Sequence, residues 1–184
     1  AIGSSTGGVE ALQVLLRDWP EDCPPTMIVQ HLNANFSSAV ARRLDSVCRA
    51  RVVVAEPDTR LQQGHIYFAP GGDRHLMVGG TPDTLRTKLR PDAPVSGHRP
   101  SVDVLFQSVV DTVGGDAVGI LLTGMGADGA KGLLALAQAG ALTIAQDEAS
   151  CTVFGMPRAA IELGAARYVA PLERIASHAL AGAA

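Results

Sequence analysis

Short apolar runs alternate with segments of helical periodicity along most of this chain. The apolar runs have the length of β-strands and lie at residues 1–3, 26–30, 51–55, 117–122, 141–145 and 168–170. The segments between them repeat apolar residues at helical spacing, as at residues 9–19, 36–48, 102–113, 129–139, 156–163 and 172–180. Near-continuous apolar strands joined by helices form parallel sheets that are covered on both faces. The alternation therefore predicts an α/β fold with a doubly wound, mostly parallel sheet, a Rossmann-like arrangement in three layers.

Residues 61–90 interrupt this alternation. They contain the short apolar runs 65–70, 75–78 and 84–89, which are separated by Gly-Gly or Pro-Asp turns. Short strands divided by such turns are typical of antiparallel pairing. We therefore expect an antiparallel hairpin, built from these runs, at the edge of the sheet.

The 184 residues suffice for one well-buried domain, and no repeat or internal linker divides them. We therefore expect residues 1–184 to form a single domain. The chain begins without methionine, inside an apolar run. We expect that a further N-terminal domain precedes it in a longer protein.

Composition narrows the classes of function. The chain is 47% hydrophobic and 18% charged, with a net charge of −3 and scattered Lys and Arg, so we expect a globular protein that binds no nucleic acid. No apolar run reaches the roughly 20 residues of a membrane span, so we expect no membrane insertion. The three cysteines are far apart and form no CxxC pair, which argues against a disulfide framework and a zinc site. We expect neither a metal nor a cofactor.

Polar side chains follow three of the expected strands. Gly3-Ser4-Ser5-Thr6-Gly7 follows the first strand, His31 follows the second, and Asp128 lies in a glycine-rich loop after the strand at 117–122. Ligands of such sheets bind beyond the carboxyl ends of the strands, where the strand order reverses. A hydroxyl, an imidazole and a carboxylate at one edge are the parts of an acyl-transfer triad.

The first of these segments has two functional interpretations. A dinucleotide-binding GxGxxG motif requires glycine at position 5, which is Ser5, and an acidic residue after the second strand, where Gln30 and His31 stand. The segment does fit the G-x-S-x-G nucleophile elbow, although a packed turn of small residues would give the same pattern. His31 precedes Asp128 in the chain, so the triad order is not that of the α/β-hydrolases.

Asp128 and His31 each have an alternative. Asp147 and Glu148 also follow a strand, but Asp128 is preferred because the glycines of its loop allow backbone N–H groups to converge on an anion. His31 could instead be a buried core histidine, yet its place directly after a strand favours a functional role.

Other polar residues carry weaker expectations. His65 and His75 flank the expected hairpin and could bind a metal only with ligands from elsewhere. His98 could line the site, with its role left open. Asp103 is interpreted as a capping or surface charge and Cys151 as a packed thiol.

Five motifs together resemble one family. They are Gly3–Gly8 (GSSTGG), Gln30-His31, and residues 98–106, 122–129 and 145–157. In this order they resemble the CheB-type protein-glutamate methylesterases of bacterial chemotaxis, and the resemblance extends from residue 1 to about residue 180. Two positions depart from the family pattern: Ser4 stands where an alanine is usual, and residues 32–35 replace a segment that often contains proline.

The resemblance implies that Ser5 is the nucleophile, that His31 is the general base and acid, and that Asp128 orients the imidazole. The backbone N–H groups of Thr6 and Met125 are expected to stabilise the oxyanion. The implied substrates are glutamate γ-methyl esters on the cytoplasmic helices of chemoreceptors, with methanol released, and some members also deamidate receptor glutamines.

The implied setting is the cytoplasm. The implied partners are methyl-accepting chemoreceptors and, in the full-length system, a phospho-receiver domain and a histidine kinase. The alternative is a generic serine esterase or amidohydrolase with the same triad.

Overall fold

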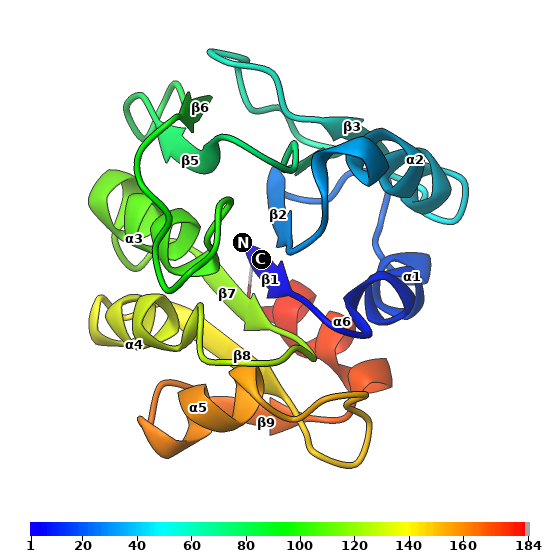
Figure 1. Cartoon of the computed structure of the whole chain (residues 1–184), viewed down its shortest axis with the longest axis vertical. Helices are drawn as coiled ribbons and strands as arrows, with labels where there is room; N and C mark the ends of the chain where they lie inside the picture. Colours follow the sequence, from blue (N-terminus) through cyan, green and yellow to red (C-terminus); the bar gives the residue numbers. More distant parts are fainter. Residues whose placement is uncertain (183–184) are drawn as a thin grey trace.

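The computed structural model describes residues 1–182, in which nine strands and six helices follow one another along the chain (Figure 1). In chain order the elements are β1 (Ile2–Ser4), α1 (Gly8–Arg17), β2 (Thr26–Gln30), α2 (Ala34–Asp45), β3 (Arg51–Val54), β4 (His65–Phe68), β5 (His75–Gly79), β6 (Arg86–Arg90), α3 (Val102–Val113), β7 (Val118–Leu121), α4 (Ala130–Gln138), β8 (Leu142–Gln146), α5 (Met156–Glu162), β9 (Tyr168–Ala170) and α6 (Leu172–Ala181).

Seven strands form one sheet in the order β3-β4-β2-β1-β7-β8-β9, and every neighbouring pair is parallel. β1 lies at the centre, where Ile2 pairs with Ile28 of β2 on one side and with Ile120 of β7 on the other. The chain winds outward from β1 first in one direction and then in the other. The predicted doubly wound parallel sheet is confirmed, and its strand order reverses beside β1, where the segments after β1, β2 and β7 meet.

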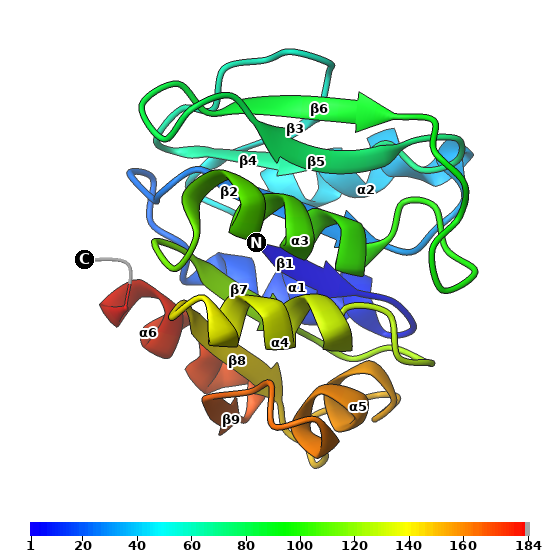
Figure 2. The ribbon, with the colours of Figure 1, turned by 90° about the vertical axis from the view of Figure 1, so that its left-hand side faces the viewer.

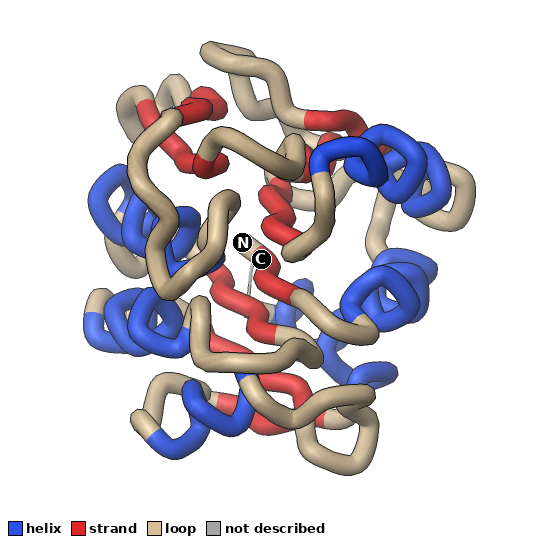
Figure 3. The backbone as a smooth tube through the Cα atoms, viewed as in Figure 1, coloured by secondary structure: helices blue, strands red, loops and turns tan. Residues whose placement is uncertain are grey.

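Helices cover both faces of this sheet (Figures 1 and 3). Helices α1, α2 and α6 enclose one apolar core, and α3, α4 and α5 enclose the other. In α1 the buried residues Ala11, Leu12, Leu15 and Leu16 recur at helical spacing. All residues of β2 are buried, as expected for a parallel strand that has helices on both sides.

The region 61–90 is only partly as predicted. β5 and β6 form an antiparallel hairpin, which is a separate two-stranded sheet packed on α3 (Figure 2). The prediction that the run beginning at His65 belongs to this antiparallel excursion is wrong, because β4 lies inside the parallel sheet between β3 and β2. Its residues Ile66, Tyr67 and Phe68 are buried, whereas in β6 the exposed Lys88 and Arg90 alternate with less exposed residues. One hairpin face therefore meets solvent, which parallel strands rarely allow.

None of the helices within residues 1–182 combines the length and the apolar character that crossing a bilayer requires.

Candidate active site

Backbone hydrogen bonds tie together the three segments that carry the predicted site residues. The Ser5 N–H donates to the Thr123 carbonyl oxygen over 3.0 Å, which links the turn after β1 to the loop after β7. The His31 N–H donates to the Ser4 carbonyl oxygen over 3.0 Å, which links the end of β2 to the same turn. The positions of Ser5, His31 and Asp128 are therefore determined by the central strands of the sheet.

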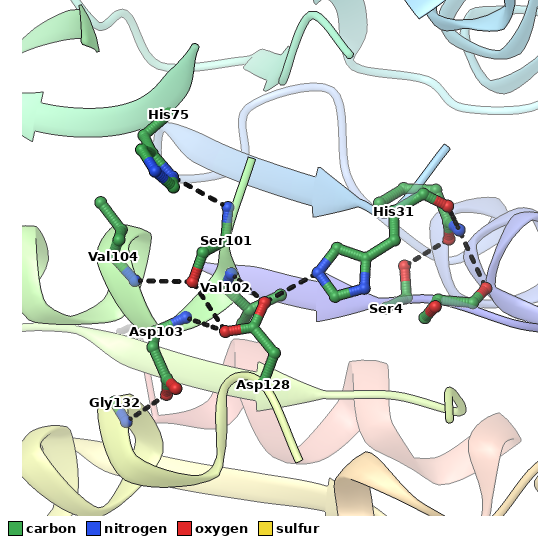
Figure 4. Close-up of polar contacts among 11 residues, drawn as sticks. Ser4, His31, His75, Ser101, Val102, Asp103, Val104, Asp128 and Gly132 are labelled. Atoms are coloured by element: carbon green, nitrogen blue, oxygen red, sulfur yellow. Dashed lines mark hydrogen bonds and ion pairs between the residues drawn. The ribbon is translucent and has the colours of Figure 1, made fainter. Parts of the chain in front are cut away.

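His31 and Asp128 are in direct contact. The distance from His31 Nε2 to Asp128 Oδ2 is 2.7 Å, and their side chains are 9% and 0% exposed. Since a carboxylate only accepts, Nε2 carries a hydrogen, and in the neutral ring Nδ1 then holds the lone pair. Nδ1 is buried and has no hydrogen-bond partner within residues 1–182. In Figure 4 the ring lies between Asp128 on one side and Ser4 on the other.

The beginning of α3 surrounds the Asp128 carboxylate with donors. The Ser101 hydroxyl donates over 2.7 Å, the Val102 N–H over 2.7 Å and the Asp103 N–H over 3.1 Å (Figure 4). Burial by itself raises the pKa of Asp128, but the hydrogen bonds from His31, Ser101 and the two backbone groups outweigh it and lower that pKa below its ordinary value. Asp128 is therefore a stable anion at the positive end of a helix.

Ser101 is held in turn by a histidine. Its hydroxyl accepts from the Val104 N–H over 3.4 Å, so the predicted N-cap is confirmed. Its own N–H donates to His75 Nδ1 over 3.1 Å, and His75 Nε2 donates to the Ala93 carbonyl oxygen over 3.0 Å. His75 thus uses both ring nitrogens in hydrogen bonds, and no group of side chains suited to a metal ion occurs in the described part of the chain.

The interpretation of Asp103 as a capping or surface charge is too simple. Its carboxylate accepts from the Gly132 N–H over 2.7 Å and so connects α3 to α4. Burial, the largest influence, raises the pKa of Asp103. Asp103 therefore helps to fix the helix whose N-terminus holds Asp128.

His98 covers one face of the His31 ring. The ring centroids are 3.7 Å apart and the planes differ by 4°. Burial and the neighbouring His31 lower the pKa of His98, which favours its neutral form. A cleft beside the two rings is also lined by Leu32, Asn33, Gly97, Arg99 and Pro100. The segment that departs from the family pattern, residues 32–35, thus contributes to the rim of this cleft.

Two backbone donors near Ser5 are unpaired. Within residues 1–182 neither the Thr6 N–H nor the Met125 N–H has a hydrogen-bond acceptor. The loop that carries Met125 lies close to the turn that carries Ser5, since a Cβ on Gly124 would stand 2.7 Å from the Ser5 Cβ. The Thr123 hydroxyl donates to the Thr6 carbonyl oxygen over 3.0 Å and fixes the loop against that turn. Both predicted oxyanion donors are therefore at the same edge as Ser5.

The CheB methylesterase family model matches residues 1–179. The chain belongs to this family. It is 50% identical over 179 residues to the protein-glutamate methylesterase/protein-glutamine glutaminase of Bordetella bronchiseptica, covering 97% of this chain and 51% of that protein. It is 57% identical over 165 residues to a Caulobacter vibrioides protein of the same name, numbered 1, covering 90% and 48%. The chain spans about half the length of these curated relatives.

A solved member of the CheB family has the same fold. The crystal structure of the Thermotoga maritima CheB methylesterase catalytic domain superposes with a TM-score of 0.94 at 35% identity, covering 98% of this chain and 95% of that one. The resemblance inferred from the five motifs is thereby confirmed.

The structure places Asp147, the alternative carboxylate, and Cys151 in surroundings that do not suit a role beside His31. Asp147 accepts from the Ser150 N–H and hydroxyl over 3.0 and 2.6 Å, and no hydrogen bond joins it to His31 in the described structure. Burial raises the pKa of Cys151 to about 11, which keeps it a thiol and fits the interpretation as a packed residue.

No hydrogen bond joins the Ser5 hydroxyl to His31 among the described residues, and such contacts are often long before substrate binds.

The contacts of Gln30 and His75 with the site were not predicted, whereas His98 lies at the site as expected and only its stacking on His31 is new. Gln30 stands in one of the family motifs and is not acidic, but neither fact predicts its bridge to Ser5, and His75 was considered only as a metal ligand. The partners of these residues lie far away along the chain, so local pattern could not reveal the contacts. The one available signal for Gln30 was its position at the end of a strand.

Proposed function

We propose that residues 1–184 form the catalytic domain of a cytoplasmic protein-glutamate methylesterase. Its substrates are glutamate γ-methyl esters on the cytoplasmic helices of chemoreceptors. The observation that carries the proposal is the buried His31–Asp128 pair, which leaves one ring nitrogen unpartnered at the edge that bears Ser5. The printed names of the Bordetella and Caulobacter relatives support the substrate class.

In the proposed reaction Ser5 Oγ attacks the ester carbonyl carbon while His31 Nδ1 takes the hydroxyl proton. Nε2 keeps its hydrogen bond to Asp128, whose negative charge stabilises the imidazolium. The Thr6 and Met125 N–H groups donate to the developing oxyanion, and one such donor is typically worth about 3–4 kcal/mol.

The tetrahedral intermediate then collapses. The bond to the methoxy oxygen breaks, and the proton held on His31 Nδ1 passes to that oxygen, so methanol leaves. Water attacks the glutamyl ester on Ser5, gives a proton to His31, and releases the receptor glutamate and the Ser5 hydroxyl. The receptor gains a negative charge at each converted position.

The two ring nitrogens are used in the reverse of the familiar order. In the serine protease template, Nδ1 faces the aspartate and Nε2 serves the serine. Here Nε2 faces Asp128, so Nδ1 of His31 is the nitrogen that remains for Ser5. The same acyl-enzyme chemistry applied to a glutamine amide would release ammonia, and we include this deamidation in the proposal.

The proposal extends to the setting of the whole protein. Methyl-accepting chemoreceptors are the proposed substrates and partners. A phospho-receiver domain and a histidine kinase are the proposed regulatory partners in the full-length system. Membership of the CheB family supports both statements.

The test is methanol release from a methylated receptor cytoplasmic fragment. Ser5→Ala should lose on the order of 10⁴ or more in rate, because the nucleophile is absent. Ser4→Ala, which removes the neighbouring hydroxyl, should be far more active than Ser5→Ala. Inactivity of Ser4→Ala with an active Ser5→Ala would overturn the choice of nucleophile. A small aryl ester turned over far faster than the receptor ester would favour the generic esterase instead.

A further inference from the structure

The side chain of Gln30 bridges the two residues between which the proposed proton transfer takes place. Gln30 is the last residue of β2 and is 4% exposed. Its Nε2 donates to the Ser5 carbonyl oxygen over 2.9 Å and to the His31 carbonyl oxygen over 2.9 Å. Both amide hydrogens are therefore used on the backbone of the nucleophile and of the base.

The Ser5 and His31 carbonyl oxygens determine which way the Gln30 amide faces, because they can only accept. The Ser4 hydroxyl, itself fully buried, donates to Gln30 Oε1 over 2.7 Å. A flipped amide would place Oε1 against the two carbonyl oxygens of Ser5 and His31, which cannot donate. The hydrogen-bond network thus allows one orientation, and Ser4 supplies the donor that completes it.

The space for this amide is made by the nucleophile turn. A Cβ on Gly8 would overlap Gln30 Oε1 and would stand 2.7 Å from the Ser4 Cβ. The glycine at position 8 therefore lets the amide enter the turn. The His31 N–H, which donates to the Ser4 carbonyl oxygen, closes the same cluster from the other side.

We propose that Gln30, further supported by the Ser4 hydroxyl, is a positioning residue that holds Ser5 and His31 at the separation required for proton transfer. The inference rests on the proposed function, since it assigns Gln30 to that reaction. Gln30 touches no reacting atom and acts through the two main-chain carbonyl groups. Small errors in the relative position of nucleophile and base are costly, because a misplacement of about 1 Å can lower a rate about 10²-fold.

The experiment measures the rate at which a small organophosphate labels Ser5, together with hydrolysis of a small aryl ester. Both readouts report the alignment of Ser5 and His31 and need no receptor. Gln30→Met, which keeps the length of the side chain but cannot donate, should lose about 10²-fold in labelling and in kcat, with little change in KM. Ser4→Ala should lose about tenfold, because it removes one of the three hydrogen bonds that hold the amide.

Ser108→Ala is the matched control for Ser4→Ala. Ser108 in α3 is 2% exposed, and its hydroxyl accepts from the Val78 N–H and donates to the Leu105 carbonyl oxygen, with no hydrogen bond to the site residues among those described. A purely structural role for Ser4 predicts that both variants lose stability in urea while labelling Ser5 at the wild-type rate. The proposal predicts that only Ser4→Ala labels slowly.

Labelling of Gln30→Met and Ser4→Ala within about threefold of wild type would overturn the inference alone. If Gln30→Met does not fold, Ser4→Ala decides the question by the same criterion. An unreactive Ser5 in the wild-type chain would overturn the proposed function and the inference with it. Normal labelling of the wild type with slow labelling of both variants supports the inference, even where the receptor ester is not the substrate.

Discussion

The two sides of His31 differ in how completely their polar groups are satisfied. On one side Asp128 is fully buried and accepts hydrogen bonds from His31, Ser101 and two backbone N–H groups. On the other side Nδ1 is buried without a partner among residues 1–182, and the Thr6 and Met125 N–H groups are unpaired within the same range. Met125 itself is 70% exposed.

This difference indicates that one side of His31 fixes the orientation of its ring, while the other side is open to a substrate. Leaving a buried polar group unpaired costs about 1–3 kcal/mol, so a stable fold keeps few such groups. On the Asp128 side the fold satisfies every bond that sets the angle of the imidazole. On the Ser5 side it leaves open the bonds that a substrate would complete.

Asp128→Asn breaks the satisfied side and should have the largest effect. The amide cannot accept all the bonds of the carboxylate or stabilise an imidazolium, so kcat should fall by about 10⁴. Activity is measured with the aryl ester, with Asp111→Asn on the exposed face of α3 as the control. Retention of more than a tenth of wild-type kcat by Asp128→Asn would contradict the assignment.

The same variant should change the dependence of stability on pH. The pKa of Asp128 is lowered below its ordinary value of 3.8, so its contribution is fully present above that pH. It is lost as the pH falls through the lower folded value, because the unfolded state then binds more protons. Urea unfolding from pH 5 to pH 2 should show less acid destabilisation in Asp128→Asn than in wild type.

Met125→Pro breaks the open side and should have an intermediate effect. Proline removes the backbone N–H, so kcat should fall about 10²- to 10³-fold if this group serves the oxyanion. Met125→Ala keeps the N–H and should remain within a few-fold of wild type, since the exposed side chain is not part of the argument. Equal kcat values for the two variants, with equal melting temperatures, would exclude this donor.

His98→Gln sharpens the comparison and should have the smallest effect. The pKa of His98 is lowered from 6.5, by burial and by His31, so the unfolded state binds more protons as the pH drops below 6.5. Wild-type stability should therefore decline from pH 7 toward the lower folded value. In urea unfolding, His98→Gln and His98→Phe should both show a smaller decline of the unfolding free energy with falling pH. The same dependence on pH in wild type and in both variants would contradict this prediction.

Much of the fold could be predicted from local pattern, but pairing could not. The alternation of apolar runs and helical segments correctly indicated a doubly wound parallel sheet. The run at His65 was assigned to the wrong sheet, because a short apolar run looks the same whether its neighbour along the chain or a distant strand pairs with it.

The site was partly predictable for a related reason. Ser5, His31 and Asp128 follow parallel strands, and the carboxyl ends of such strands share one edge whatever their order. That the three residues share this edge needed no strand order, but their closeness depends on β2 and β7 lying on either side of β1. The stacking of His98 and the bridge made by Gln30 depended on that order and on side-chain direction.

By itself the sequence determined which segments become strands and helices and which polar residues stand at strand ends, since periodicity and glycine spacing are relations between near neighbours in the chain. Only the tertiary structure decided that His31 presents Nε2 to Asp128, 97 positions away, and leaves Nδ1 without a partner among the described residues. The physical reason is that a hydrogen bond depends on tenths of an ångström and on direction. Those are set when β1, β2 and β7 pack side by side and the start of α3 closes over Asp128.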